Sequence, residues 1–144
     1  MKDKPFVGVW LDHRRALMFW ANGQAEAKLV QVESGYQEEG EPIDSVRAAA
    51  QVGHAGGVPH ANLDSRRREQ LKHYYKDLDQ RLRDAQEIFL FGPGQAKREL
   101  ASLIRKDKGS RAQLKAVESA DKKMTQPQMM ARIREFFSLP REAV

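Results

Sequence analysis

The chain has 144 residues and a mass of 16.4 kDa, the usual size of one domain, and 40% of its residues are hydrophobic. It has no cysteine, which excludes disulfides, thiolate catalysis and cysteine-ligated zinc. The net charge of +5 and the isoelectric point of about 9.6 favour a polyanionic partner. We therefore expect a single domain over residues 1–144.

The N-terminal segment predicts three antiparallel strands. Phe6–Leu11 is apolar throughout, as expected for a central strand that is covered on both faces. The polar segment Asp12–Arg15 joins it in a tight hairpin to a second strand, Ala16–Trp20. Asn22-Gly23 predicts another hairpin, and Ala27–Val32 alternates like a strand at the edge of a sheet.

The length of the apolar run Phe6–Leu11 indicates where the protein is located. Asp12 interrupts it after about six residues, too few for the core of a signal peptide or for a membrane span. We expect a cytoplasmic protein with no membrane partner.

Residues 33–63 have no periodic pattern and predict a long flexible loop between the third strand and a helix. Its first part, Glu33–Asp44, contains acidic side chains and no Lys or Arg, whereas Gly53–His60 is rich in glycine and histidine. The alanines at 48–50 favour a short helix over Ser45–Gln51. Loops of this length are usually functional or disordered.

A long helix is expected to follow, with Asp64 as its N-cap. Its apolar stripe has spacings of three and four and consists of Leu71, Tyr74 or Tyr75, Leu78, Leu82 and Ala85. A fourth strand is predicted at Glu87–Phe91. The turn Gly92-Pro93-Gly94 then leads into a helix with a stripe of Ala96, Leu100, Leu103 and Ile104.

The C-terminal part predicts one more strand and helix. Ala112–Val117 is the fifth strand, and Thr125–Gln128 has the spacing of a capping box with Pro127 in the first turn. The last helix should bury Met129, Met130, Ile133, Phe136 and Phe137. The order β-β-β-α-β-α-β-α predicts an α/β fold in which an antiparallel meander continues into parallel strands.

The basic residues concentrate on the long helix. Arg66, Arg67 and Arg68 are expected in its first turn, where the helix dipole disfavours cations by ~0.3–1 kcal/mol each, so that a bound phosphate would offset the cost. Lys72 and Lys76 continue the basic face at helical spacing. The alternative is a solvated basic face held by nearby acidic side chains. A second basic region, which we expect to be an exposed face, comprises Lys97, Arg98, Arg105, Lys106, Lys108 and Arg111.

Other side chains raise further possibilities for chemistry. His54, His60 and His73 lack the spacing of a metal site, so we expect neither a metal nor another cofactor. Asp12 follows the first strand, where it either serves a nuclease or hydrogen-bonds its own turn. The Gly92–Gln95 segment lacks the lysine and hydroxyl of a phosphate-binding P-loop and is interpreted as a turn before a helix.

Three phrases of the sequence carry a resemblance to a known family: FVGVWLDHRRALMF, IFLFGPGQAKREL and VESADKKMTQPQMMARIREFF. The chain resembles the small bacterial relatives of the central domain of archaeal and eukaryotic peptide-chain release factors and Pelota. This resemblance covers nearly the whole chain. It implies a three-layer ribonuclease-H-like fold with a mixed five-stranded sheet, and a protein of the translation machinery.

In the release factors, a Gly-Gly-Gln loop before the long helix positions water on the peptidyl-tRNA ester. The matching place here reads His54-Ala55-Gly56-Gly57-Val58, so the glycines are present and valine replaces the glutamine. Valine has no polar side-chain group to bind the ester or water, and the hydrolytic role is therefore not transferred to this chain.

Three functions follow as hypotheses. The first is a non-enzymatic module that contacts ribosomal or transfer RNA with Arg66–Arg68, Lys72 and Lys76, and with a loop containing His54, Gly56, Gly57 and His60. The second is a tRNA-ester hydrolase that uses His54 or His60. The third is a protein–protein adaptor of the translation machinery that uses the acidic segment Glu33–Asp44.

Overall fold

The computed structural model describes residues 5–21, 28–35 and 60–138, with side chains from Ser65 onward in the long helix. Within these residues the chain forms a five-stranded sheet of order β3-β2-β1-β4-β5. The strands are β1 (Phe6–Leu11), β2 (Arg15–Ala21), β3 (Lys28–Glu33), β4 (Glu87–Gly92) and β5 (Gln113–Ser119). β1, β2 and β3 pair antiparallel, whereas β4 pairs parallel with both β1 and β5. The predicted mixed five-stranded sheet is confirmed.

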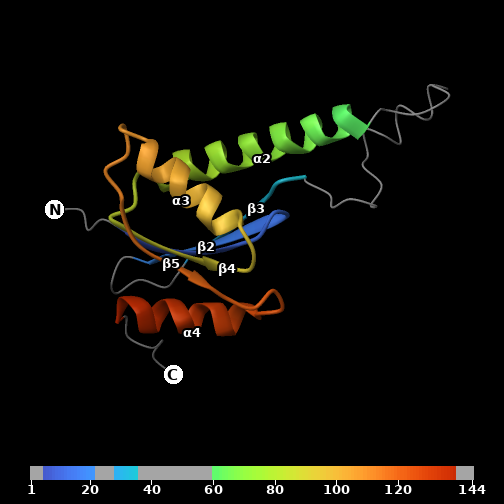
Figure 1. Cartoon of the computed structure of the whole chain (residues 1–144). Coiled ribbons are helices and arrows are strands. Elements are labelled where there is room, and N and C mark those ends of the chain that lie inside the picture. Colours follow the sequence, from blue (N-terminus) through green and yellow to red (C-terminus); the bar gives the residue numbers. More distant parts are fainter. Residues whose placement is uncertain (1–4, 22–27, 36–59, 139–144) are drawn as a thin grey trace.

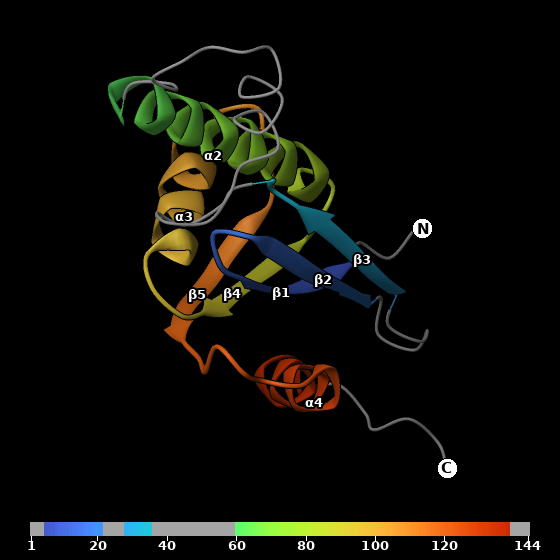
Figure 2. The same cartoon turned by 90° about the vertical axis from the view of Figure 1, so that its right-hand side faces the viewer.

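Helices cover both faces of this sheet. The helices α2 (His60–Leu82) and α3 (Ala96–Lys106) lie side by side on one face, and α4 (Gln126–Phe137) lies on the other (Figures 1 and 2). The described part of the chain thus forms three layers, and β1 at the centre of the sheet is covered on both sides. This arrangement explains why β1 and β4 are apolar at nearly every position.

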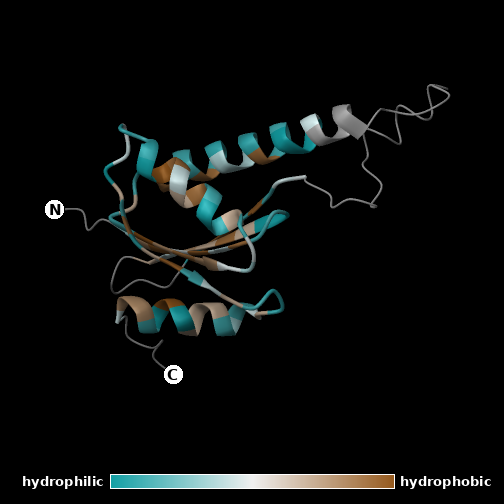
Figure 3. Ribbon diagram, viewed as in Figure 1, coloured by the Kyte–Doolittle hydropathy of each residue, from teal (hydrophilic) through white to brown (hydrophobic). Residues whose placement is uncertain are grey.

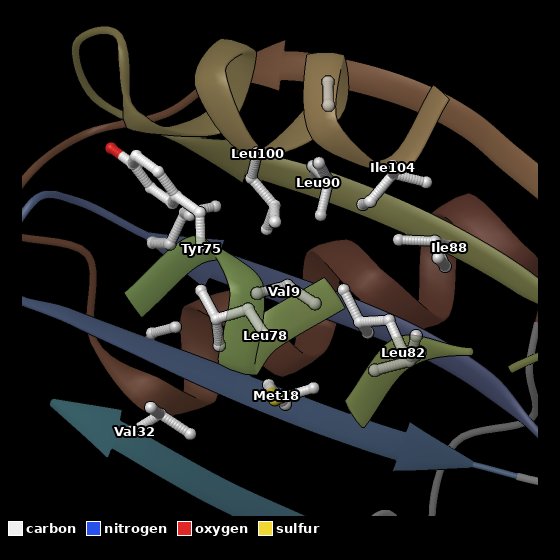
Figure 4. Packing of buried hydrophobic residues seen from close by; sticks show 14 of the residues in the cluster. Val9, Met18, Val32, Tyr75, Leu78, Leu82, Ile88, Leu90, Leu100 and Ile104 are labelled. Carbon is white, nitrogen blue, oxygen red and sulfur yellow. The ribbon is translucent and has the colours of Figure 1, made fainter. Parts of the chain in front are cut away.

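The larger core lies between the sheet and the pair α2 and α3. The strands contribute Val9, Met18 and Leu90, and the helices contribute Leu78 and Leu100, all fully buried (Figure 4). Burying a Leu or Val side chain stabilises a fold by about 1.5–3 kcal/mol, so this layer holds α2 firmly along its inner side. Hydrophilic residues dominate α2 otherwise, in contrast to the strands (Figure 3).

The second core lies between the sheet and α4. The ring of Phe136 stacks on Phe89 at 4.1 Å between centroids, and Phe137 stacks on Phe6 at 5.2 Å. Thr125 and Gln128 form the predicted capping box, because each side chain binds the backbone N–H of the other. The predicted buried face of this helix packs against the core, but only Met129 and Ile133 are buried; Met130, Phe136 and Phe137 are half-buried at its edge.

The helix boundaries differ from the prediction at one important place. The long helix begins at His60 and not at Asp64, which lies inside it. Hydrogen bonding along a helix is cooperative, so a good capping residue does not fix a start when the preceding residues also join the helix. Both Tyr74 and Tyr75 are buried, so both rings, and not only one of them, belong to the apolar stripe of this helix.

Two turns agree with the sequence. Asp12 ends β1, and its Oδ1 accepts hydrogen bonds from the backbone N–H groups of Arg14 at 2.8 Å and Arg15 at 2.9 Å. Gly92 ends β4 with φ +150°, and a side chain there would collide with the carbonyl oxygen of Leu11. The predicted hairpin at Asn22-Gly23, the predicted helix Ser45–Gln51 and most of the 33–63 loop lie outside the described residues.

Candidate functional site

The basic residues that the sequence predicted to bind RNA all lie on α2. Arg66, Arg68, Lys72 and Lys76 are exposed, whereas Arg67 is half-buried. Because α2 begins at His60, the arginines lie beyond its first turn. The dipole effect decays within that turn, so the predicted electrostatic penalty on the arginines is wrong and no longer supports a phosphate site at the helix end.

Three of these cations form a row along one side of α2. Arg68, Lys72 and Lys76 are spaced four residues apart, which places their side chains on neighbouring turns of one helix face. Arg66 lies about 160° around the helix from Arg68, at about 100° per residue. We call Arg68, Lys72 and Lys76 the basic row.

The basic row has no ion-pair partner among the described side chains, in contrast to other cations of the molecule. Arg81 pairs with Asp77 at 3.1 Å and Arg83 pairs with Asp107 at 2.9 Å, both near the C-terminal end of α2. The charges near that end are therefore partly neutralised within the chain, while those of the basic row face solvent.

The neighbouring helix adds cations to the same outer layer. Arg98, Arg105 and Lys106 of α3 are exposed, and so are Lys108 and Arg111 in the connection to β5. Lys97 does not belong to this exposed group, contrary to prediction: it is 3% exposed, and its Nζ donates to the carbonyl oxygen of Gly94 at 2.6 Å. Burial, followed by the nearby charge of Arg98, lowers the pKa of Lys97.

The predicted loop residues His54, Gly56 and Gly57 lie outside the described residues. His60 is the first residue of α2, and its side chain is likewise outside them. His73 lies exposed on α2.

A polar cluster that the sequence analysis did not predict lies at the carboxyl ends of β1 and β4. Tyr75 of α2 donates its hydroxyl hydrogen to Glu99 Oε1 at 2.6 Å, and His13 Nε2 lies 3.0 Å from the same oxygen. His13 follows β1, and Glu99 lies in the first turn of α3, after β4. The only signal in the sequence was that each follows a parallel strand, since ligands of α/β proteins often bind at such strand ends.

A groove of about 490 Å³ adjoins this cluster. The residues that line it come from α2 and from the start of α3: Ser65, Arg68, Glu69, Leu71, Lys72, Tyr75 and Glu99. Two members of the basic row therefore also form a wall of the groove. Its lining combines two cations, two carboxylates, the hydroxyl groups of Ser65 and Tyr75, and the apolar side chain of Leu71.

Asp12, the carboxylate considered for a nuclease, has structural partners, and so do two carboxylates at and after the end of β5. The carboxylate of Asp12 closes its own turn, as one of the two interpretations predicted. Glu118 pairs with Arg132 at 2.7 Å, and Asp121 Oδ1 accepts from the backbone N–H of Lys123 at 2.9 Å. Across the described ranges, no three His, Asp or Glu side chains come close enough to hold a metal ion.

A buried carboxyl pair fixes the C-terminal end of α2. Asp79 is 6% exposed and lies against Asp107, whose carboxylate accepts from Arg83 Nε at 2.9 Å and from the backbone N–H of Gly109 at 2.9 Å. Burial raises the pKa of Asp79 to about 6, and the hydrogen bond and charge of Asp107 add to this effect. The hydrogen bonds from Asp79 and Arg83 lower the pKa of Asp107.

No helix in the described residues is long and apolar enough to cross a membrane. No family model matches the sequence, and no curated protein sequence matches it. Among solved structures, the chain is similar to an archaeal translation termination factor, aRF1, with 14% identity over 95% of this chain and a TM-score of 0.49. It is also similar to a PilM-PilN type IV pilus biogenesis complex, with 17% identity over 93% of this chain and a TM-score of 0.40. The chain spans 41% and 43% of the length of these two chains, and neither similarity shows a family or an activity.

Proposed function

We propose that this protein is a translation-associated module that contacts the phosphate backbone of ribosomal or transfer RNA with α2. The observation that carries the proposal is the basic row. Arg68, Lys72 and Lys76 are exposed at intervals of one turn and have no ion-pair partner among the described side chains. Phosphate contacts of this kind dominate the affinity of proteins for nucleic acids.

The arrangement of the two outer helices supports this proposal. Because α3 lies beside α2, its exposed cations Arg98, Arg105 and Lys106 extend the positive layer beyond a single row (Figure 2). A surface that carries cations on two neighbouring helices suits a broad polyanion better than a single small anion. The contact proposed here needs no cofactor.

The translation context comes from the resemblance of the sequence to release-factor relatives. We propose that the Gly53–His60 segment, including His54, Gly56 and Gly57, contacts the same RNA, since it leads into α2 and ends at the first residue of that helix. With Val58 in place of the glutamine, position 58 has no polar side-chain group to bind the ester or the water. The proposed role is therefore binding and not peptide release.

The test compares two charge reversals that change the net charge equally. Lys72→Glu/Lys76→Glu reverses two of the three cations of the basic row, whereas Lys122→Glu/Lys123→Glu reverses two exposed lysines in the connection between β5 and α4. Co-sedimentation with ribosomes and binding to structured RNA are measured at several salt concentrations. We expect at least a tenfold loss of affinity for the first variant and a much smaller loss for the second.

Equal losses in the two variants would show that only net charge matters, and would overturn the assignment to α2. Ribosome association that survives both reversals and nuclease treatment would favour the protein–protein adaptor instead.

A further inference from the structure

The groove beside the basic row contains the carboxylate of Glu99, which is held in place through only one of its two oxygens. Oε1 of Glu99 receives the hydroxyl of Tyr75 at 2.6 Å and lies 3.0 Å from His13 Nε2. Within the described part of the chain, Oε2 of Glu99 has no hydrogen-bond partner. Since the side chain is 47% exposed and lines the groove, Oε2 is available to accept a hydrogen bond from a ligand.

The same groove also presents cations that do not neutralise this carboxylate. Arg68 and Lys72 line it, yet neither forms an ion pair with Glu99 within the described residues. A ligand that satisfies both kinds of group carries an anion for the cations and a hydrogen-bond donor for Glu99. A ribonucleotide has this combination, because its phosphate is anionic and its 2′-hydroxyl donates.

We infer that this groove binds one nucleotide of an RNA strand, with its phosphate on Arg68 and Lys72 and its 2′-hydroxyl on Glu99. The inference rests on the proposed function, because Arg68 and Lys72 also belong to the basic row, which would contact the RNA backbone both inside and outside the groove. Ser65 supplies a hydroxyl group for a phosphate oxygen. Tyr75 and His13 are positioning residues that fix the Glu99 carboxylate.

This site distinguishes RNA from DNA. A 2′-deoxynucleotide leaves Oε2 of Glu99 without a donor, and a 2′-O-methyl group both removes the donor and occupies space beside the carboxylate. By contrast, the phosphate contacts of the basic row are the same for both nucleic acids.

The experiment measures the binding of one single-stranded sequence as RNA, as DNA and as 2′-O-methyl RNA. The wild-type protein should bind RNA about tenfold more tightly than either of the others. Glu99→Ala should reduce the RNA affinity to that for DNA and leave the DNA affinity unchanged or slightly higher, because a negative charge near the phosphate is removed. Glu118→Ala is the matched control: this carboxylate is 45% exposed and ion-paired with Arg132, and lies elsewhere in the fold.

A second variant distinguishes an effect on the proposed site from an effect on folding. Tyr75→Phe keeps the buried ring and removes only the hydroxyl that fixes Glu99, so it should lower the ratio of RNA to DNA affinity about threefold. A role in folding alone would lower both affinities together and leave the ratio unchanged.

The outcomes separate this inference from the proposed function. If the wild-type protein binds RNA and DNA equally, or if Glu99→Ala preserves the preference for RNA, the inference of a nucleotide site in the groove is wrong. The proposal that the basic row binds the RNA backbone is not affected by that result. If the protein binds neither nucleic acid, the proposed function fails and the nucleotide site fails with it.

Discussion

The carboxyl groups of Asp79 and Asp107 lie against each other between the C-terminal end of α2 and the segment that leads from α3 to β5. Asp107 is held by Arg83 and by the backbone N–H of Gly109, and Asp79 is almost completely buried. Two carboxylates this close cannot both be charged without cost, and burial places the proton on Asp79. The pKa of Asp79 is accordingly raised from 3.8 to about 6.

This pair predicts how stability depends on pH. Between pH 3.8 and about 6 the folded state binds a proton on Asp79 that the unfolded state has released, so the free energy of unfolding falls as pH rises through this window. Asp79→Asn retains a hydrogen-bond donor for Asp107 and removes the buried charge. We expect it to stabilise the protein by about 1–2 kcal/mol at pH 7.5 and to flatten the dependence of the free energy of unfolding on pH between pH 3.8 and about 6.

Urea unfolding at several pH values provides the measurement for Asp79. Asp84→Asn, which removes an exposed carboxyl group just beyond the same end of α2, serves as the control. A destabilised Asp79→Asn protein at pH 7.5 would contradict the protonation assigned here.

The salt dependence of RNA binding tests how many phosphates the basic row contacts. For single-stranded RNA, the slope of log K against log salt concentration changes by about 0.7 for each phosphate contact. A variant that has lost two phosphate contacts should therefore have a slope about 1.4 smaller in magnitude than that of the wild-type protein. Lys72→Ala/Lys76→Ala should produce this change. Arg66→Ala, on the other side of α2, should change the slope less than Arg68→Ala does, and the opposite order would mean that α2 binds RNA through a different face.

Tyr74 anchors the first hairpin. Its hydroxyl donates to the carbonyl oxygen of Asp12 at 3.0 Å, and burial, with a smaller effect of the Asp12 charge, raises the pKa of Tyr74 well above its usual range. The phenol therefore stays protonated at any ordinary pH. Tyr74→Phe should lower the free energy of unfolding by about 1 kcal/mol in denaturant titrations, the usual value of one hydrogen bond. An unchanged stability would show that water replaces this contact.

Gly8 allows α4 to approach the sheet. A methyl group at this position would overlap the side chain of Ile133, which is fully buried against β1. Gly8→Ala should therefore destabilise the protein by about 1–3 kcal/mol. Ile133→Val/Gly8→Ala should recover part of this loss relative to the sum of the single substitutions, as a double-mutant cycle in thermal unfolding would reveal. Strict additivity would contradict the close approach.

The element order, the central place of β1 and the capped start of α4 could all be predicted from the amino-acid sequence. These features depend on neighbouring residues: continuous apolar runs mark strands covered on both faces, and Thr125 and Gln128 cap a helix locally. The tertiary structure decided the start of α2 at His60, because cooperative helix formation extended it past Asp64. It also buried Lys97 and brought His13, Tyr75 and Glu99 together. Those three side chains lie on separate elements, and their contact depends on the parallel pairing of β1 with β4 beneath α2, which no local pattern encodes.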